Sequence, residues 1–273
     1  MTTTPTIAFE EIAPEQAAAW LEHNNLDNRP LRAAAVAAIV RDMEAGNYLV
    51  TGDSIKFDTN GRLMDGQHRL SAIAKHGRTV LAAVAKGLDP RVQVVIDAGS
   101  KRSGADALKF AGLEKYRTVV ASMAKLDRAL SLGGVRADSI SVARGRSTNA
   151  EVTQWWEENP DAERAAADGS GLTHSIGATS KSAVSYALLR LRRIDEEAAN
   201  EFFASIAEMR TNGAGDPRLA LTRFLGELSG NKAVASMTLF GTFRAWNAWR
   251  SGESLTRIVS TTRTGVRTIP EPA

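Results

Sequence analysis

The residues best suited to do chemistry lie together in residues 63–70, LMDGQHRL, where an acid, a glycine, an amide, an imidazole and a guanidinium follow one another. A chain that passes from a strand through a glycine into a helix can bind an anion, because the first N–H groups of a helix have no partner within it and carry the positive end of the helix dipole. Gly66 lets a ligand approach the backbone closely, and Gln67, His68 and Arg69 add side-chain donors. These residue types predict phosphate binding.

The same residues also have a purely structural interpretation. Asp65 could be the N-cap of the following helix, and His68 could be a core histidine that donates to a carbonyl group. Arg69 could form an ion pair with Asp58 or Asp65. Because a strand, a turn with one glycine and a helix often follow one another, spacing alone leaves both interpretations open.

A hairpin and a helix are predicted on the two sides of this turn. Residues 53–58 alternate in polarity like a half-buried strand, Asn60-Gly61 is a tight-turn signal, and the chain is extended again at 63–64. Residues 67–76 then have helical apolar spacing and end at Gly77. The turn is therefore expected to join a β-hairpin to a helix.

Further elements surround this unit. One helix is predicted from Pro14, and a second has Asn28 as its N-cap, Pro30 in its first turn and Gly46 after its end. Two short apolar runs rich in β-branched residues, 80–85 and 92–96, are predicted strands.

From residue 103 onward the patterns are helical, and Thr148 with Glu151 has the form of a capping box. The segments read as helices are 103–111, 114–132, 148–158, 179–192, 195–210, 217–228 and 233–251. The predicted fold class is α+β, a small mixed-sheet domain over 1–102 followed by an α-helical domain over 103–252. Residues 253–273 are expected to form a flexible basic tail.

Composition narrows the classes of protein. The chain has 273 residues, no cysteine and a formal net charge of +3, with a sequence pI near 9.3. The lack of cysteine excludes disulfides, thiolate catalysis and cysteine zinc sites. Neither a membrane-length apolar run nor a secretory signal is present, so we expect a cytoplasmic protein without a membrane partner. The histidines are isolated in sequence, so no metal site is expected.

Charged and aromatic residues elsewhere carry weaker signals. Two groups of arginines could be solvated or could contact phosphates: Arg136, Arg144 and Arg146, and Arg257, Arg263 and Arg267. Four tryptophans at helical spacing are expected in the core rather than as platforms for stacked bases: Trp155, Trp156, Trp246 and Trp249.

The order of motifs resembles the ParB/sulfiredoxin-like superfamily, and most of all its phage and prophage proteins described as ParB-like nuclease domain proteins. The resemblance rests on residues 28–30 (NRP), a helix closed by Gly46, the strand IKFD at 55–58, and DGQHRLSA at 65–72. An Asp-x-Gly-x-x-Arg element at 97–102 also fits. Members of this superfamily hold nucleotide phosphates at the turn into the helix.

The resemblance implies a set of site residues. Those expected to bind the phosphates of a nucleoside triphosphate, with or without Mg²⁺, are Arg29, Gly66, Gln67, His68, Arg69 and Arg102. Those that could act in catalysis are Asp65, His68 and Asp97, and Glu44 and Asp58 are further acids that could serve as a general base. Gln67 replaces the cysteine of sulfiredoxins, so sulfinic acid reduction is excluded. Partition ParB proteins have Glu-Arg-Arg where this chain has Gln-His-Arg, which puts CTP-gated clamping in doubt.

Three hypotheses follow. The leading one is a phage-type ParB-like protein that binds a nucleotide and acts on or near DNA. The second is an enzyme, such as a kinase or nuclease, that transfers a phosphoryl group or cleaves a phosphodiester. The third is a regulator that keeps the fold without the chemistry and binds DNA or a protein.

Overall fold

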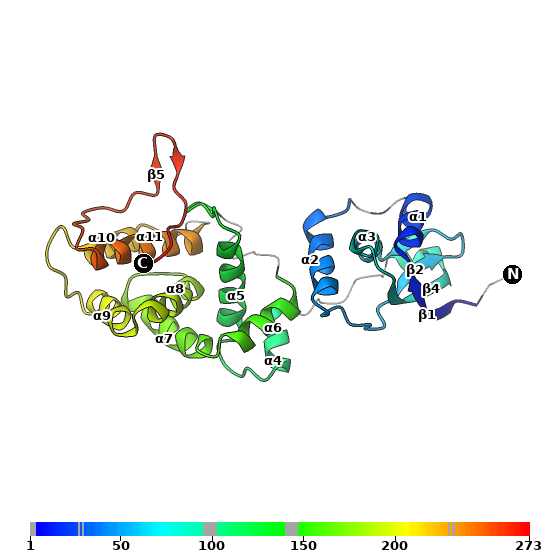
Figure 1. Cartoon of the computed structure of the whole chain (residues 1–273), viewed down its shortest axis with the longest axis horizontal. Coiled ribbons are helices and arrows are strands. Elements are labelled where there is room, and N and C mark those ends of the chain that lie inside the picture. The colour runs from blue at the N-terminus through cyan, green and yellow to red at the C-terminus, as the bar shows by residue number, and fades with distance from the viewer. Residues whose placement is uncertain are drawn as a thin grey trace. The chain divides into compact units, whose positions relative to one another are not determined.

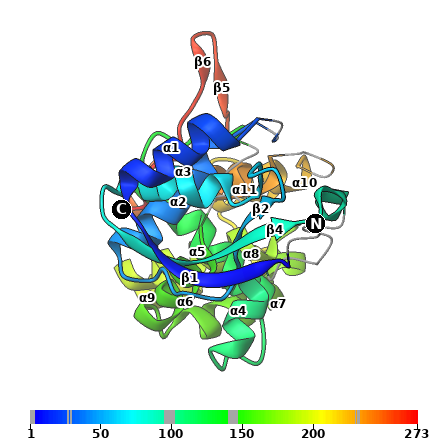
Figure 2. The same cartoon turned by 90° about the vertical axis from the view of Figure 1, so that its right-hand side faces the viewer.

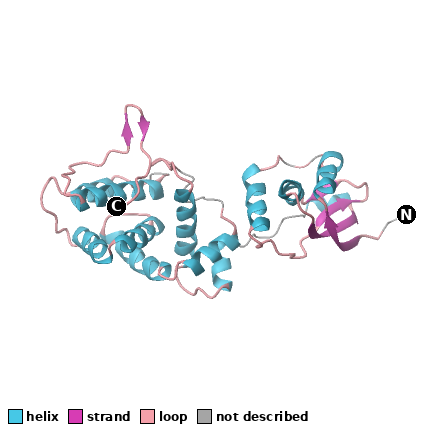
Figure 3. Cartoon of the chain, in the orientation of Figure 1, coloured by secondary structure: helices cyan, strands magenta, loops and turns pink. Residues whose placement is uncertain are grey.

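The computed structural model describes residues 4–26, 28, 30–94, 103–139, 147–228, 230 and 233–273. The chain divides into two compact units, Met1–Lys101 and Arg102–Ala273, which are described separately. The first combines a four-stranded mixed sheet with helices and the second is mostly helical (Figures 1 and 3), which confirms the predicted α+β class. No helix in the described ranges has the length and apolar character needed to span a membrane.

The sheet of the first unit has the order β1-β4-β2-β3. Its strands are β1 (Thr6–Ile12), β2 (Ile55–Asp58), β3 (Leu63–Asp65) and β4 (Val80–Leu88). β1 pairs antiparallel with β4, β4 pairs parallel with β2, and β2 pairs antiparallel with β3. The short strand β3 therefore lies at one edge of the sheet and leads straight into the helix that follows it.

The α-helices of the described part of this unit are α1 (Pro14–Asn24), α2 (Ala33–Glu44) and α3 (Gln67–His76). α1 and α3 lie along one face of the sheet (Figure 2), and α3 packs against both α1 and α2. Apolar side chains of α1, α3 and the strands form one core, which includes Ile12, Ile55, Phe57, Leu70 and Ile73. Burial of Leu70 and Ile73 orients α3, so that its first turn is held at the sheet edge.

The hairpin and the helix at 67–76 are confirmed, but two other expectations for this unit need correction, and one strand was missed. The predicted strand at 92–96 is wrong over residues 92–94, which belong to a 3₁₀ helix, η1 (Pro90–Val94), and residues 95–96 lie outside the described residues. Asn28 is not an N-cap, because α2 begins only after Arg32. β1 was not predicted from the sequence, since three of its four apolar side chains, Ile7, Ala8 and Phe9, are exposed and leave no half-buried alternation.

The second unit is built from α4 (Gly104–Phe110), α5 (Arg117–Ser131), α6 (Asn149–Glu158), α7 (Ala162–Ser175), α8 (Lys181–Ile194), α9 (Glu196–Ala207), α10 (Pro217–Gly226) and α11 (Val234–Arg250). The capping box of Thr148 and Glu151 is confirmed at the start of α6. α7 was not predicted, because its alanines and glycines make no strong apolar stripe. Trp246 is fully buried, and the other three tryptophans named above pack against the same core, as predicted.

The expected flexible tail is instead folded. Its hairpin consists of β5 (Thr261–Thr262) and β6 (Gly265–Val266), and the following residues return to the helices. The N–H of Ala137 donates to the carbonyl of Arg267, and the indole of Trp246 donates to the carbonyl of Ala273 over 2.7 Å. Because Ile258 is buried in the helical core, the segment gains more from packing than its polar composition suggests.

Candidate phosphate-binding site

Gly66 is the N-cap of α3 and has a left-handed backbone with φ of 105°. A Cβ atom at this position would lie 3.0 Å from Cγ1 and 3.2 Å from Cα of Ile55. A residue with a side chain would therefore be strained and would also collide with β2. Because glycine has no side chain, nothing from the cap residue covers the first N–H groups of α3.

Asp65, the last residue of β3, has both carboxylate oxygens occupied. Its Oδ1 accepts the N–H of Gly66 over 2.7 Å, and its Oδ2 lies 3.0 Å from Nζ of Lys56 and 3.2 Å from Nη2 of Arg69. The pair with Lys56 crosses between neighbouring strands, and the pair with Arg69 spans one helical turn. Asp65 thus fixes the turn between strand and helix, and these contacts leave it poorly placed to act as a general base.

The guanidinium group of Arg69 joins α3 to the chain that precedes β2. Its Nη1 donates to the carbonyl of Asp53, and its Nη2 donates to the carbonyl of Ser54 over 2.8 Å. Together with the bond to Asp65, these contacts leave the Arg69 side chain 19% exposed. Arg69 therefore supports the turn, and only part of its charge faces solvent.

Two asparagines that follow α1, Asn25 and Asn28, contact the beginning of α3 and the strand before it. Nδ2 of Asn28 donates to the carbonyl of Leu63 over 2.6 Å and to Oδ1 of Asn25 over 2.7 Å. Nδ2 of Asn25 in turn donates to Oε1 of the buried Gln67, 3.4 Å away. Amide groups from two separate stretches of sequence thus meet beside the first turn of α3.

His68 makes a second connection, to the chain between α1 and α2. Its Nε2 accepts the backbone N–H of Arg32 over 3.2 Å, just before α2 begins. An imidazole nitrogen that accepts a hydrogen bond carries no proton, so this contact requires the neutral form of the ring. The beginnings of α2 and α3 are thereby held next to each other.

A cleft of about 390 Å³ opens on the other side of Arg69. It is lined by the loop that follows α2, including Tyr48 and Asp53, and by Leu81 and Ala83 of β4. Burial raises the pKa of the Tyr48 hydroxyl above its ordinary value, and Asp53 adds to this effect while Arg69 opposes it. The cleft thus combines apolar side chains with the phenol of Tyr48, the guanidinium of Arg69 and the carboxylates of Asp42 and Asp53, so its lining holds charges of both signs.

Of the predicted site residues, the structure brings Asp65, Gly66, Gln67, His68 and Arg69 together at one turn. Arg29, Asp97 and Arg102 lie outside the described residues.

Two other acids were considered as a base. Glu44 is exposed near the end of α2. Asp58 is buried and accepts the N–H groups of Asn60 and Arg62, so it stabilises the β2–β3 turn.

Sequence reasoning missed Asn25, Tyr48 and Lys56. The pair of Lys56 with Asp65 could have come from the hairpin register, but an irregularity between Lys56 and Phe57 shifts that register. Asn25 and Tyr48 lie in loops without a periodic pattern, so no signal pointed to them.

Comparison of the chain with protein-family models, curated proteins and solved structures finds no match. Among the described residues, no group of three or more histidine and acidic side chains is arranged to hold a metal ion.

Proposed function

We propose that the turn at residues 63–70 binds the phosphate of a nucleotide and that the protein acts on or near DNA. The observation that carries this proposal is the start of α3 at Gly66, a cap residue without a side chain, beside the amide groups of Asn25 and Asn28. Backbone N–H groups and the helix dipole favour an anion at such a position. The resemblance to ParB/sulfiredoxin-like proteins points to the same turn.

In this proposal Arg69 supports the site more than it clamps the ligand. Its bonds to Asp53, Ser54 and Asp65 hold the start of α3 against the loop before β2. Its positive charge still favours an anion nearby. A change at Arg69 would therefore disturb the fold as well as binding, which makes it a poor test of the proposal.

His68 gives a sharper test because α3 contains a second histidine at its other end. We expect a nucleoside triphosphate with Mg²⁺ to raise the Tm by several degrees at about 100 times its Kd. His68→Ala removes the contact to Arg32 and should weaken nucleotide binding at least about fivefold. His76→Ala, in the last turn of α3, is the matched control and should bind like the unchanged protein.

DNA binding is proposed from the basic charge of the chain. With a formal net charge of +3, electrostatic attraction to phosphates is favourable and should weaken steeply as salt increases. Fluorescence anisotropy with labelled duplex DNA, with and without nucleotide, tests this part. Binding that depends on nucleotide supports the proposal, whereas the same DNA affinity with and without nucleotide favours a regulator that has lost the nucleotide function.

Phosphoryl transfer or phosphodiester cleavage is the alternative. The contacts of Asp65 do not favour it, because both carboxylate oxygens already accept or pair with protein groups. Turnover of labelled nucleotide or plasmid that is lost in Asp65→Asn, while binding is retained, would establish the enzyme instead.

A further inference from the structure

A second pocket in the first unit, of about 470 Å³, lies beside the end of α1 and the β2–β3 turn. Its lining includes Trp20, Asn24, Phe57, Thr59 and Lys86 and none of residues 63–70. Its volume lies within the range of small-molecule sites, and its walls combine aromatic rings with a few polar groups. The pocket is thus a separate place where a ligand could bind.

Two aromatic rings form the apolar part of this pocket. The centroids of Trp20 and Phe57 lie 5.1 Å apart, and the ring planes meet at 66°. Phe57 is fixed in the core on β2, whereas Trp20 is only partly buried. Trp20 therefore keeps part of its ring outside the core, where Nζ of Lys86 lies over it, 5.8 Å from the ring centroid. A flat ligand that stacks on Trp20 would take the place of this ammonium group.

The charged groups around the pocket are paired within the protein. Nζ of Lys86 lies 2.7 Å and 3.1 Å from the two carboxylate oxygens of Glu10. Oδ2 of the buried Asp58 lies 3.3 Å from Nε of Arg62. An ionic ligand would have to compete with one of these pairs, so the lining favours an uncharged one.

The remaining polar groups are neutral. Nδ2 of Asn24 donates to the carbonyl of Gly61 over 2.7 Å, which fixes the orientation of the amide at the pocket wall. Thr6 and Thr59 add hydroxyl groups to the lining. Amide and hydroxyl groups can recognise the hydrogen-bonding edge of a heterocycle.

We propose that this pocket binds an uncharged planar heteroaromatic ring of nucleobase size. The ring stacks on Trp20, and its polar edge meets Asn24 and the threonine hydroxyls. This inference does not depend on phosphate binding at residues 63–70, since the two sites use different residues.

The experiment follows the indole N–H signals of the full chain by NMR during titration with adenine, which is neutral at pH 7. Trp20→Leu identifies the signal of Trp20 among the five tryptophans. We expect a saturable shift of that signal with a Kd in about the millimolar range or below. Cyclohexanol, which is uncharged but not planar, and benzoate, which is planar but anionic, should bind at least about tenfold more weakly.

Variants complete the test. Trp20→Leu should abolish binding of adenine, measured by saturation transfer to the ligand, and Asn24→Ala should weaken it at least about threefold. Lys75→Ala, at an exposed position of α3 outside the pocket, should bind adenine like the unchanged protein. If Trp20→Leu does not fold, Asn24→Ala and the comparison of the three probes still decide the question.

The inference is overturned if adenine causes no saturable shift of the Trp20 signal, if cyclohexanol binds equally well, or if Asn24→Ala binds adenine like the unchanged protein. Inorganic triphosphate, tested alone, separates the two sites. Binding of adenine without binding of triphosphate would support this inference and contradict the proposed function. Binding of triphosphate without binding of adenine would support the proposed function and contradict this inference.

Discussion

Nε2 of His68, in the first turn of α3, accepts the backbone N–H of Arg32, 3.2 Å away, at the point where α2 begins. This contact joins two stretches of chain that are more than thirty residues apart in the sequence. It acts together with the bond from Asn28 to the carbonyl of Leu63, which ties the same segment to β3. The proposed phosphate site is therefore held from two sides before any ligand binds, which lowers the entropic cost of binding.

Gly66 is expected to be the least replaceable residue of the turn. Gly66→Ala combines a left-handed backbone with a collision against Ile55, and we expect a loss of about 3 kcal/mol in the free energy of unfolding. Gly77→Ala is the matched control, because Gly77 also has a positive φ but has nothing within 4 Å of the added Cβ. It should cost only about 1 kcal/mol. Urea denaturation measures the free energy of unfolding of both variants. Equal losses in Gly66→Ala and Gly77→Ala would contradict the role given to Ile55.

Asp65 should contribute to stability through its two cationic partners. In Asp65→Asn the charge that attracts Lys56 and Arg69 is lost, although an oxygen remains for the N–H of Gly66. The side chains of Lys56, Asp65 and Arg69 are largely shielded from solvent. We therefore expect a loss of about 1–2 kcal/mol in the free energy of unfolding. Arg91 and Asp89 form an exposed pair in the same unit, and Asp89→Asn should have little effect on stability. If Asp65→Asn lost no more stability than Asp89→Asn, the turn would not depend on the pairs of Asp65 with Lys56 and Arg69.

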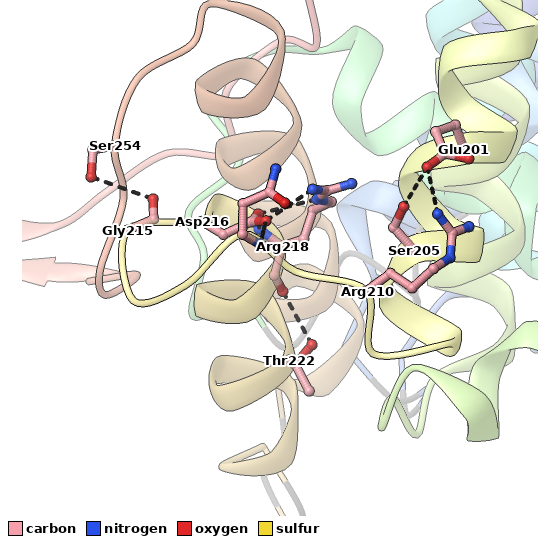
Figure 4. A network of polar contacts seen from close by, with 9 residues as sticks. Glu201, Ser205, Arg210, Gly215, Asp216, Arg218, Thr222 and Ser254 are labelled. Atoms are coloured by element: carbon pink, nitrogen blue, oxygen red, sulfur yellow. Dashed lines mark hydrogen bonds and ion pairs between the residues drawn. The ribbon is translucent and has the colours of Figure 1, made fainter.

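Asp216 should make the helical unit sensitive to acid. Figure 4 shows its carboxylate beside Arg218, which donates from Nε over 3.1 Å and from Nη2 over 2.9 Å. Burial alone would raise the pKa of Asp216, but the hydrogen bonds from Arg218 and from the N–H of Asn212 outweigh it and hold the pKa below its ordinary value. The resulting stability is present above the unfolded pKa, near about 3.9, and is lost as the pH falls through the lower folded pKa.

We therefore expect Asp216→Asn to lower the free energy of unfolding by about 3 kcal/mol at pH 7, with a smaller difference below about pH 4. Asp138, whose pair with Arg136 is at least half exposed, provides the control Asp138→Asn, which should have little effect at either pH. Thermal unfolding of the unchanged protein and both variants, from pH 7 to below about pH 4, measures these differences. A difference that stays constant with pH would show that the ionised carboxylate is not the source of the stability.

The C-terminal segment should stabilise the helical unit. Deleting residues 267–273 removes the backbone bonds to Val135 and Ala137 and the side-chain bonds to Trp246 and Asn247. We expect the Tm of the helical unit to fall by several degrees. Arg263→Ala, at the exposed tip of the β5–β6 hairpin, should leave the Tm unchanged. An unchanged Tm after the deletion would support a flexible tail after all.

Local patterns were sufficient to predict much of the fold. Asn60-Gly61 and the apolar spacing of residues 67–76 located the hairpin and α3, and Thr148 with Glu151 located the start of α6. In each case the deciding interactions lie within a few residues of one another. The sequence therefore predicted the turn at residues 63–70 as the junction between a strand and a helix.

Long-range contacts could not be predicted in this way. The bond between His68 and Arg32 and the position of Tyr48 near Arg69 depend on how distant segments pack. The folded C-terminal segment was missed for the same reason, because Ile258 and Ile269 pack on helices far away in the sequence. Sequence reasoning thus located the turn, but not the neighbours that hold it.

Hydrogen exchange of the first turn of α3 tests the central claim most directly. With each of the four ribonucleoside triphosphates and Mg²⁺ at millimolar concentration, the account predicts slower exchange at residues 67–70 and in the segment before α2 for at least one nucleotide. The first turn of α8, which is capped by the side chain of Ser180, should not change. Unchanged exchange at residues 67–70 with all four nucleotides would contradict phosphate binding at this turn.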